Sequence, residues 1–413
     1  MKIIIITQYF WPENFRINDL AVHLVERGHE VIVLTGMPNY PEGRFFPGYG
    51  FFKKLRQEYN GVKVFRVPLF PRGSGRGMRL ALNYASFALC ASFFTPFLYK
   101  EKYDLIFVFE PSPITVGLPA IALKKIISAP IMLWVQDLWP ESLSATDAVK
   151  SQTILNLVSR LVRLIYQGCD KILVTSRAYV TSIEKLGIDS SRISYFPQSV
   201  ESIYQPLVLE LDAPERVIMP EGFRVVFAGN IGAAQDFGTI LDAADILKDY
   251  TNIHWIIIGD GRLRAWVEAQ IQKRKLAKTV HLLGRYPVEL MPRFFSLADV
   301  LMVTLKRAPI FALTVPGKIQ SYMACGKPII AALDGEGARM IEESGSGIVC
   351  PTENSDLLAK AVFKMYQMPA VQRENMGKQG RDYYEANFDQ NMLIDRLERW
   401  AQELCKKVSY TDI

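Results

Sequence analysis

Short apolar runs alternate with helical patterns from the first residue, and this alternation limits the fold more than any other feature. The first half contains six such runs, at residues 2–7, 30–35, 62–67, 104–109, 131–135 and 171–175. Runs of this length and composition are typical of strands buried on both faces of a parallel sheet. An amphipathic helical pattern at 17–27 ends before Gly28, a residue common at helix C-termini. The pattern predicts an α/β fold with helices covering a parallel sheet.

The alternation stops once and then resumes. Residues 196–222 hold four prolines and no clean periodicity, which indicates a linker. A second series of strands is expected at 224–228, 254–259, 280–283, 300–304, 328–331 and 347–349, followed by helices from about Ser355. We therefore expect two Rossmann-like lobes facing a central cleft, at residues 1–199 and 200–385. Residues 386–413 form a C-terminal helix expected to pack back on the first lobe.

Positive charge is concentrated in the first half. Residues 1–210 contain 23 Lys and Arg against 17 Asp and Glu, whereas residues 211–413 contain 25 of each class. From Arg44 to Arg79, nine basic residues accompany a single acid, Glu58. Such a patch suits an anionic partner, such as a phospholipid surface or a lipid phosphate. The alternative is a solvated basic face.

Residues 80–99 form a stretch of 20 residues without a charge, which is long enough to span a bilayer. The stretch contains Asn83 and Pro96 and lies between two expected strands of the first sheet, so spanning would break that sheet. The remaining alternatives are a core helix and a helix lying partly in a membrane interface. We expect residues 44–99 to face an anionic membrane surface.

The cysteines and the N-terminus favour a cytoplasmic protein. The five cysteines are scattered singly, without metal-ligand spacing, which favours free thiols in a reducing compartment. The first apolar run is short and lacks a small-residue cleavage site, so it predicts a strand rather than a signal peptide.

Several phosphate-binding motifs are missing. The sequence has no Walker A motif and no GxGxxG after the first strand, which weakens nucleotide-hydrolase and nicotinamide interpretations. It also lacks two aspartates separated by one residue, the DxD pattern that holds a divalent metal beside a diphosphate. We expect no metal cofactor. Basic side chains, helix N-termini and backbone amides would then neutralise a diphosphate.

The second half offers such groups. A glycine-rich turn with Gly229, Asn230 and Gly232 follows the first strand and precedes a helix expected from about Phe237. Basic residues follow later strands or begin helices, namely Arg262, Lys306, Arg307 and Lys318. A lysine in the first turn of a helix opposes the helix dipole, so Lys318 suggests a diphosphate contact, and a surface lysine is the alternative.

Acids follow two central strands of the first half, at Glu110, Asp137 and Glu141. The carboxyl ends of parallel strands meet at one edge of a sheet, so these carboxylates are site candidates, with helix N-caps as the alternative. The first two loops add further candidates, Glu13, Asn14, Arg16, Asn39 and Tyr40.

These features together resemble family 4 of the retaining glycosyltransferases, which have the GT-B fold. The likeness covers nearly the whole chain and includes FWPENFRINDLAVHLVERGHEVIVLTGMPNYPEG, LWVQDLWPES, FAGNIGAAQDFGTILDAA, IIIGDG and VPGKIQSYMACGKPIIA. The first and last of these stretches resemble the O-antigen, capsule and colanic-acid subgroup, in particular N-acetyl-L-fucosamine transferases.

The resemblance implies roles for several residues. The turn at 229–232 would meet the donor diphosphate, Arg285 and Tyr286 would flank the nucleobase, and residues 317–322 would hold phosphates and ribose. From their own positions at strand and helix ends, and not from the resemblance, we expect Glu110, Asp137 and Lys318 to be the catalytic residues. Transfer would proceed with retention and without a covalent nucleophile, the leaving phosphate deprotonating the incoming hydroxyl.

Two departures from the family pattern matter. The family's paired glutamates fall on Leu313 and Ser321, although Ser321 can still bond a ribose hydroxyl. The usual basic pair is replaced by Gln235 and its neighbours. The charge of the phosphates would then have to be neutralised by other basic residues, namely Arg262, Lys306, Arg307 and Lys318. Glu336 would take over sugar contacts, or belong to a solvated loop.

The resulting hypothesis is transfer of a UDP-linked sugar, such as N-acetyl-L-fucosamine, onto a polyprenyl-diphosphate-linked saccharide. The reaction would take place at the inner face of a bacterial inner membrane, with the acceptor in the first lobe and the nucleotide sugar in the second. The alternatives are a nucleotide-sugar epimerase or phosphorylase of the same fold, and a non-catalytic nucleotide-binding protein.

Overall fold

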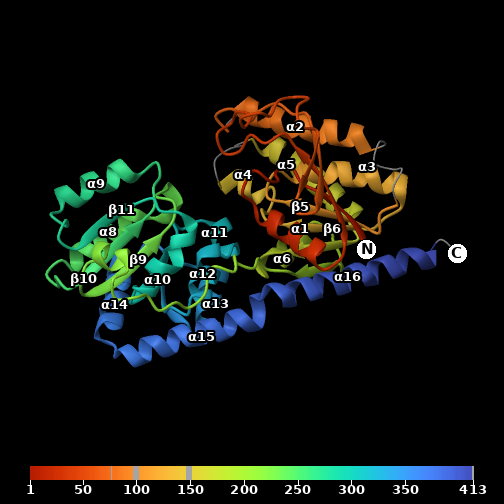
Figure 1. The fold of residues 1–413 in the computed structure, drawn as a ribbon. Coiled ribbons are helices and arrows are strands. Elements are labelled where there is room, and N and C mark those ends of the chain that lie inside the picture. Colours follow the sequence, from red (N-terminus) through yellow and green to blue (C-terminus); the bar gives the residue numbers. More distant parts are fainter. Residues whose placement is uncertain (76, 96–101, 146–150, 412–413) are drawn as a thin grey trace. The chain divides into compact units, whose positions relative to one another are not determined.

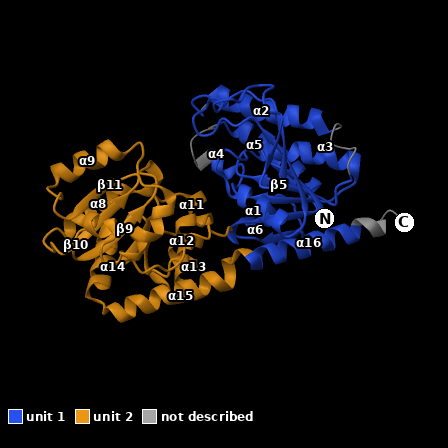
Figure 2. Ribbon diagram, viewed as in Figure 1, with its two compact units in different colours: residues 1–197, 391–413 blue, residues 198–390 orange. Residues whose placement is uncertain are grey.

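The computed structural model describes residues 1–75, 77–95, 102–145 and 151–411, and the chain forms two compact units. The first unit comprises residues 1–197 and 391–413, and the second comprises residues 198–390 (Figure 2). Each unit contains a largely parallel sheet with helices on it (Figure 1), which confirms the α/β interpretation. The boundary at Pro197 and Gln198 lies within the expected linker, which also contains a short helix, α7 (Pro214–Ile218).

The sheet of the first unit has the order β3-β4-β2-β1-β5-β6-β7-β8 within the described chain. Its strands are β1 (Lys2–Ile6), β2 (Glu30–Gly36), β3 (Arg56–Tyr59), β4 (Val62–Val67), β5 (Leu105–Glu110), β6 (Ile131–Val135), β7 (Lys171–Val174) and β8 (Ile193–Tyr195). The edge strands β3 and β8 were not expected, because β3 is polar and β8 has only three residues. Strand β3 runs antiparallel to β4.

The helices of this unit are α1 (Arg16–Glu26), α2 (Gly77–Phe94), α3 (Gly117–Ile127), α4 (Glu141–Ala145), α5 (Gln152–Gly168), α6 (Ala178–Glu184) and α16 (Gln390–Thr411). One sheet face packs on α1 and α16 through side chains that include Ile3, Ile5, Phe107, Leu24 and Leu397. Successive side chains of a strand alternate between faces, so Ile4, Ile6 and Gln8 point to the opposite face. There Gln8 bonds Asn83 of α2 (2.6 Å).

Helix α2 covers most of the uncharged stretch expected at 80–99, and residues 96–99 lie outside the described residues. Helix α3 packs against both α2 and α5. Among the described residues, no helix combines the length and apolar character needed to cross a bilayer.

The sheet of the second unit has the order β11-β10-β9-β12-β13-β14. Its strands are β9 (Phe223–Ala228), β10 (Ile253–Ile258), β11 (Val280–Gly284), β12 (Val300–Thr304), β13 (Ile329–Ala332) and β14 (Gly347–Cys350). Besides α7, its helices are α8 (Phe237–Ile246), α9 (Arg264–Lys273), α10 (Met291–Ser296), α11 (Pro309–Leu313), α12 (Gly317–Ala324), α13 (Glu336–Ser344), α14 (Ser355–Gln367) and α15 (Ala370–Phe388). The strand order reverses between β9 and β12, where ligands bind in such sheets.

Candidate functional site

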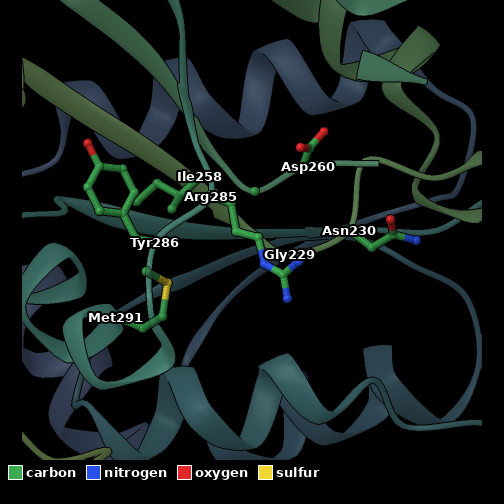
Figure 3. A pocket seen from close by; sticks show the side chains of 8 residues that line it. Gly229, Asn230, Ile258, Asp260, Arg285, Tyr286 and Met291 are labelled. Carbon is green, nitrogen blue, oxygen red and sulfur yellow. The ribbon is translucent and has the colours of Figure 1, made fainter. Parts of the chain in front are cut away.

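A pocket of about 360 Å³ lies at the carboxyl ends of β9 and β10 in the second unit. It is lined by Gly229, Asn230, Ile258, Gly259, Asp260, Arg285, Tyr286 and Met291 (Figure 3). The pocket therefore contains four residues expected from the sequence, Gly229, Asn230, Arg285 and Tyr286. It lies beside the reversal of strand order, where the fold places ligands.

Two glycines bring the backbone close together at this pocket. Gly229 has φ +141° and Gly259 has φ +147°, conformations that L-residues rarely adopt. A Cβ atom on Gly259 would lie 1.9 Å from the Gly229 carbonyl oxygen, so a side chain cannot be accommodated there. The pocket thus has a wall of backbone without side chains, to which a ligand can come close. The N–H groups of Gly229 and Gly259 themselves donate to the carbonyls of Ile258 and Gly284 (2.8 Å each).

Lys318 lies directly beside Gly229. Its Nζ donates to Gln235 Oε1 (2.8 Å) and lies 3.7 Å from the centroid of the Phe227 ring. Burial lowers the pKa of Lys318 to about 7, because the ammonium has lost much of its hydration. A Cβ atom on Gly229 would lie 2.7 Å from Lys318 Cε, so the glycine is what makes room for the lysine.

Arg285 and Tyr286 come from the turn that follows β11. Arg285 is exposed, and in Figure 3 its guanidinium lies between Met291 and Asn230. The Tyr286 ring packs against Phe294, with ring centroids 4.7 Å apart. An exposed cation and a supported aromatic ring at one pocket are suited to a phosphorylated, ring-containing ligand.

The other basic candidates of this unit do not line the pocket. Arg262 and Lys306 are exposed. Arg307 donates to Thr352 Oγ1 (3.3 Å) and to the Thr352 carbonyl (3.2 Å), and its guanidinium lies 3.9 Å from the Asp334 carboxylate. These contacts hold Arg307, which follows β12, against the loop after β14.

Of the remaining candidates of the second unit, two have side chains that bind other groups of the protein, and two are glycines at the starts of helical turns. Ser321 Oγ donates to the carbonyl of Gly317, one turn earlier in α12 (3.3 Å). Glu336 accepts two hydrogen bonds from Arg339, at 2.7 and 3.1 Å. Gly232 begins a short 3-10 turn, and Gly317 begins α12.

In the first unit the sheet register brings Glu110 and Asp137 together. Glu110 ends β5 opposite Val135, and Asp137 follows two residues later. Burial raises the pKa of Glu110 well above its usual range, the negative charge of Asp137 adds to this, and the backbone N–H groups of Asp137 and Gln136 offset part of it. Burial also raises the pKa of Asp137 to about 6.

Two tyrosines that the sequence did not single out lie close to these acids. The charges of Asp137 and Glu110 add to the burial that raises the pKa of Tyr84, on α2, and that of Tyr179, on α6. Tyr179 donates to the Gln136 carbonyl (3.4 Å). No local pattern signals these tyrosines, because their helices are distant in sequence from the acids.

The loop candidates of the first unit form a largely internal network. Glu13 Oε1 accepts from the backbone N–H groups of Asn39 (2.8 Å) and Tyr40 (2.7 Å), which ties two loops together. Burial raises the pKa of Glu13 to about 7. Asn39 is fully buried, whereas Tyr40 is partly exposed and has the Arg72 guanidinium 4.7 Å from its ring. Asn14 is exposed, and Arg16 and Glu141 are half-buried.

Comparisons with known proteins agree with this architecture. The family model "Glycosyl transferase 4-like domain" matches residues 14–198, and the model "Glycosyl transferases group 1" matches residues 212–383. A solved structure of HepE from Anabaena in complex with UDP has 15% identity and a TM-score of 0.71, over 98% of this chain and 100% of that one. The fold is thus GT-B, as expected.

Two relatives are similar in sequence. WcaI of Escherichia coli K12, assigned as a colanic acid biosynthesis glycosyl transferase, is 25% identical over 79% of this chain and 82% of its own length. WbjE of Pseudomonas aeruginosa, assigned as a glycosyltransferase, is 30% identical over 66% of this chain and 68% of its own length. With both family models matched in order along the sequence, the chain belongs to the group 1 glycosyltransferases.

Proposed function

We propose that this glycosyltransferase moves a sugar from a UDP-linked donor onto a polyprenyl-diphosphate-linked saccharide during synthesis of a bacterial surface polysaccharide. N-acetyl-L-fucosamine is the sugar that we propose, on the resemblance of residues 10–43 and 315–331 to transferases of that sugar. Two relatives support a role in polysaccharide synthesis. The name of WcaI refers to colanic acid biosynthesis, and that of AmsK to amylovoran biosynthesis.

The observation that carries the proposal is the pocket beside Gly229. It combines an exposed backbone wall, the guanidinium of Arg285 and the ring of Tyr286, with the ammonium of Lys318 alongside. These features suit a nucleoside diphosphate: a wall without side chains lets the phosphates come close, the cations neutralise their charge, and the aromatic ring offers a surface to the nucleobase. The fold neighbour HepE, solved with UDP, supports UDP as the nucleotide.

In this proposal Lys318 stabilises the charge that develops on the leaving diphosphate, and transfer proceeds with retention and without a divalent metal. The ammonium already lies beside Gly229, so little reorganisation is needed when charge develops. The absence of a DxD sequence supports the same view. Addition of a chelator should leave the rate unchanged.

The acceptor would approach the first unit near Asp137. The pKa of the Asp137 carboxyl group is about 6, so at neutral pH the group is largely ionised. In that form it can accept a hydrogen bond from a sugar hydroxyl. Glu110 lies beside it and, being buried, favours its neutral form. Residues 44–99 would place this unit on the anionic inner face of the cytoplasmic membrane, although residues 76 and 96–99 lie outside the described residues.

The test is to incubate the purified protein with a panel of labelled UDP sugars and with membranes that contain lipid-linked saccharides. We expect label in the lipid fraction with one UDP sugar and retained configuration in the product. UDP binding without transfer to any acceptor would support a non-catalytic protein. Conversion of a nucleotide sugar into its epimer would support an epimerase.

A further inference from the structure

The loop after β4 holds Arg72 half-buried at the carboxyl edge of the first sheet. Its backbone N–H donates to Oδ1 of the fully buried Asn39, in the loop after β2 (3.0 Å). Its guanidinium lies 4.7 Å from the centroid of the Tyr40 ring, and Nη1 donates to the hydroxyl of Tyr9, in the loop after β1 (3.5 Å). Loops that follow three adjacent strands therefore fix the position of this side chain.

The charge of Arg72 is not neutralised within the described part of the chain. Its side chain contacts an aromatic ring and a hydroxyl group, and none of the described carboxylates pairs with it. Arg27 of the same unit differs, because its guanidinium is ion-paired with Asp395 and Glu398. A half-buried guanidinium has lost part of its hydration, so an anion binds it more strongly than it binds a fully solvated one. Arg72 is therefore suited to an anionic ligand.

The Tyr40 ring under Arg72 belongs to a cluster of three aromatic rings. Tyr9 stacks on Phe15, with centroids 5.1 Å apart, and these two rings lie 5.5 and 5.2 Å from Tyr40. The cluster holds the Tyr40 ring in place, and this ring supports one face of the guanidinium. Gly75, with φ +68°, leaves room beside the guanidinium, since a Cβ there would lie 3.3 Å from Arg72 Nη2. A planar guanidinium fixed in this way matches two phosphate oxygens.

Tyr84 of α2 links Arg72 with the acids of the first unit. Burial raises the pKa of Tyr84, the charge of Arg72 offsets part of this rise, and the charge of Asp137 adds to it. The Tyr84 hydroxyl group is therefore within electrostatic range of both a cation and an anion. One ligand can use both charges if it carries a phosphate group at one end and sugar hydroxyls at the other.

We propose that Arg72, supported by Tyr40, binds the diphosphate of the lipid-linked acceptor and so positions the attached saccharide toward Asp137. The proposal deepens the proposed function and rests on it for the identity of the acceptor. The ligand class is a prenyl diphosphate. A single guanidinium fixed between loops at strand ends suits one bound molecule, whereas a bilayer surface presents many headgroups to many exposed cations.

The first test measures binding of farnesyl diphosphate, a soluble prenyl diphosphate, by isothermal titration calorimetry with the full-length protein. Saturating UDP is present to occupy the pocket of the second unit. Arg72→Gln should weaken binding by roughly 10- to 100-fold, the range expected for lost hydrogen bonds to a charged group. Arg72→Lys keeps the charge and loses the planar fork, so its affinity should fall between the two. Arg27→Gln is the matched control in the same unit and should bind like the wild type.

Three results would overturn the proposal: no binding of farnesyl diphosphate by the wild type, wild-type affinity in Arg72→Gln, or an equal loss in Arg27→Gln. A competition experiment separates the substrate from a bilayer headgroup. Dihexanoyl phosphatidylglycerol, a soluble lipid with one phosphate, should displace farnesyl diphosphate poorly. Displacement at equal concentration would assign Arg72 to membrane headgroups and overturn the proposal.

The second test uses the transfer assay. Arg72→Gln should raise KM for the lipid-linked acceptor by a factor similar to its loss of farnesyl diphosphate affinity. KM for the UDP sugar should not change, because Arg72 belongs to the first unit. A rise confined to the KM of the UDP sugar would contradict the proposal. Failure of the proposed function would appear as absence of transfer by the wild type, whereas the binding test requires no transfer and would still decide the role of Arg72.

Discussion

The ammonium of Lys318 donates to Gln235 Oε1 (2.8 Å) and lies over the Phe227 ring, beside the glycine that lines the pocket. The lysine is thus held by one neutral hydrogen-bond partner and by an aromatic face. A neutral amide neutralises none of the charge, so the ammonium remains available to an anionic ligand. This arrangement leaves Lys318 as a second cation for a diphosphate, beside the pocket that Arg285 lines.

Replacing Lys318 with Ala should lower kcat/KM for transfer by the equivalent of about 2–4 kcal/mol, the scale of losing one preorganised electrostatic donor. Gln235→Ala is the matched control: it removes the partner of the lysine and keeps the charge, so a smaller loss is expected. Steady-state kinetics with saturating acceptor measure both variants. A near-normal rate for Lys318→Ala would remove this residue from the site.

UDP affinity should depend on pH through the same lysine. Its pKa is about 7 in the free protein, so the ammonium is charged below pH 7 and increasingly neutral above it. Binding of a diphosphate above pH 7 must then take up a proton, and affinity should fall by up to about tenfold per pH unit between pH 8 and 9. Isothermal titration in buffers of different ionisation enthalpy measures this uptake. Lys318→Ala should bind weakly and without the pH slope.

Asp137→Asn should lower kcat by roughly 10- to 100-fold. This is the range expected when the loss of a hydrogen bond to a charged group costs about 1.5–3 kcal/mol. The wild-type rate should rise with pH around the Asp137 pKa of about 6 and level off above it, because only the ionised carboxylate accepts strongly. The variant should lose this rise. UDP affinity serves as the control and should not change, since Asp137 belongs to the first unit.

Gly259→Ala should destabilise the second unit by at least about 2 kcal/mol and weaken UDP binding, because its Cβ would overlap the Gly229 carbonyl and its φ is positive. Gly238→Ala is the matched control. Gly238 lies in α8, and a Cβ there would make only an ordinary contact, 3.7 Å from Asp236 Oδ1. Thermal unfolding of the two variants should differ clearly; equal stability would contradict the close backbone approach at the pocket.

The sequence predicted the central strands of both sheets, because each is a short apolar run between turn or helix signals. It did not predict β3, whose residues Arg56–Tyr59 are polar and pair only with neighbouring β4. The pocket was predictable in part, since glycines at strand ends and the family resemblance both indicate Gly229, and the resemblance indicates Arg285. Ile258 and Met291 have no such signal, since an apolar residue near a strand end looks like any core residue.

The partners of side chains were harder to predict than their positions. Arg307 is held by Thr352, 45 residues away, and Glu13 is held by the backbone of Asn39 and Tyr40. A sequence shows that these residues are charged, but the neighbour that satisfies each charge is decided by the packing of distant segments.

Transfer of labelled sugar to a lipid-linked acceptor tests the central claim most directly. Purified wild-type protein and Lys318→Ala are each incubated with UDP-N-acetyl-L-fucosamine, a UDP sugar panel and acceptor-containing membranes, and the lipid fraction is counted. The account predicts label in lipid with a UDP sugar for the wild type and a drop of roughly 30- to 1,000-fold in rate for the variant. Absence of label in lipid with every UDP sugar, from protein that binds UDP, would contradict it.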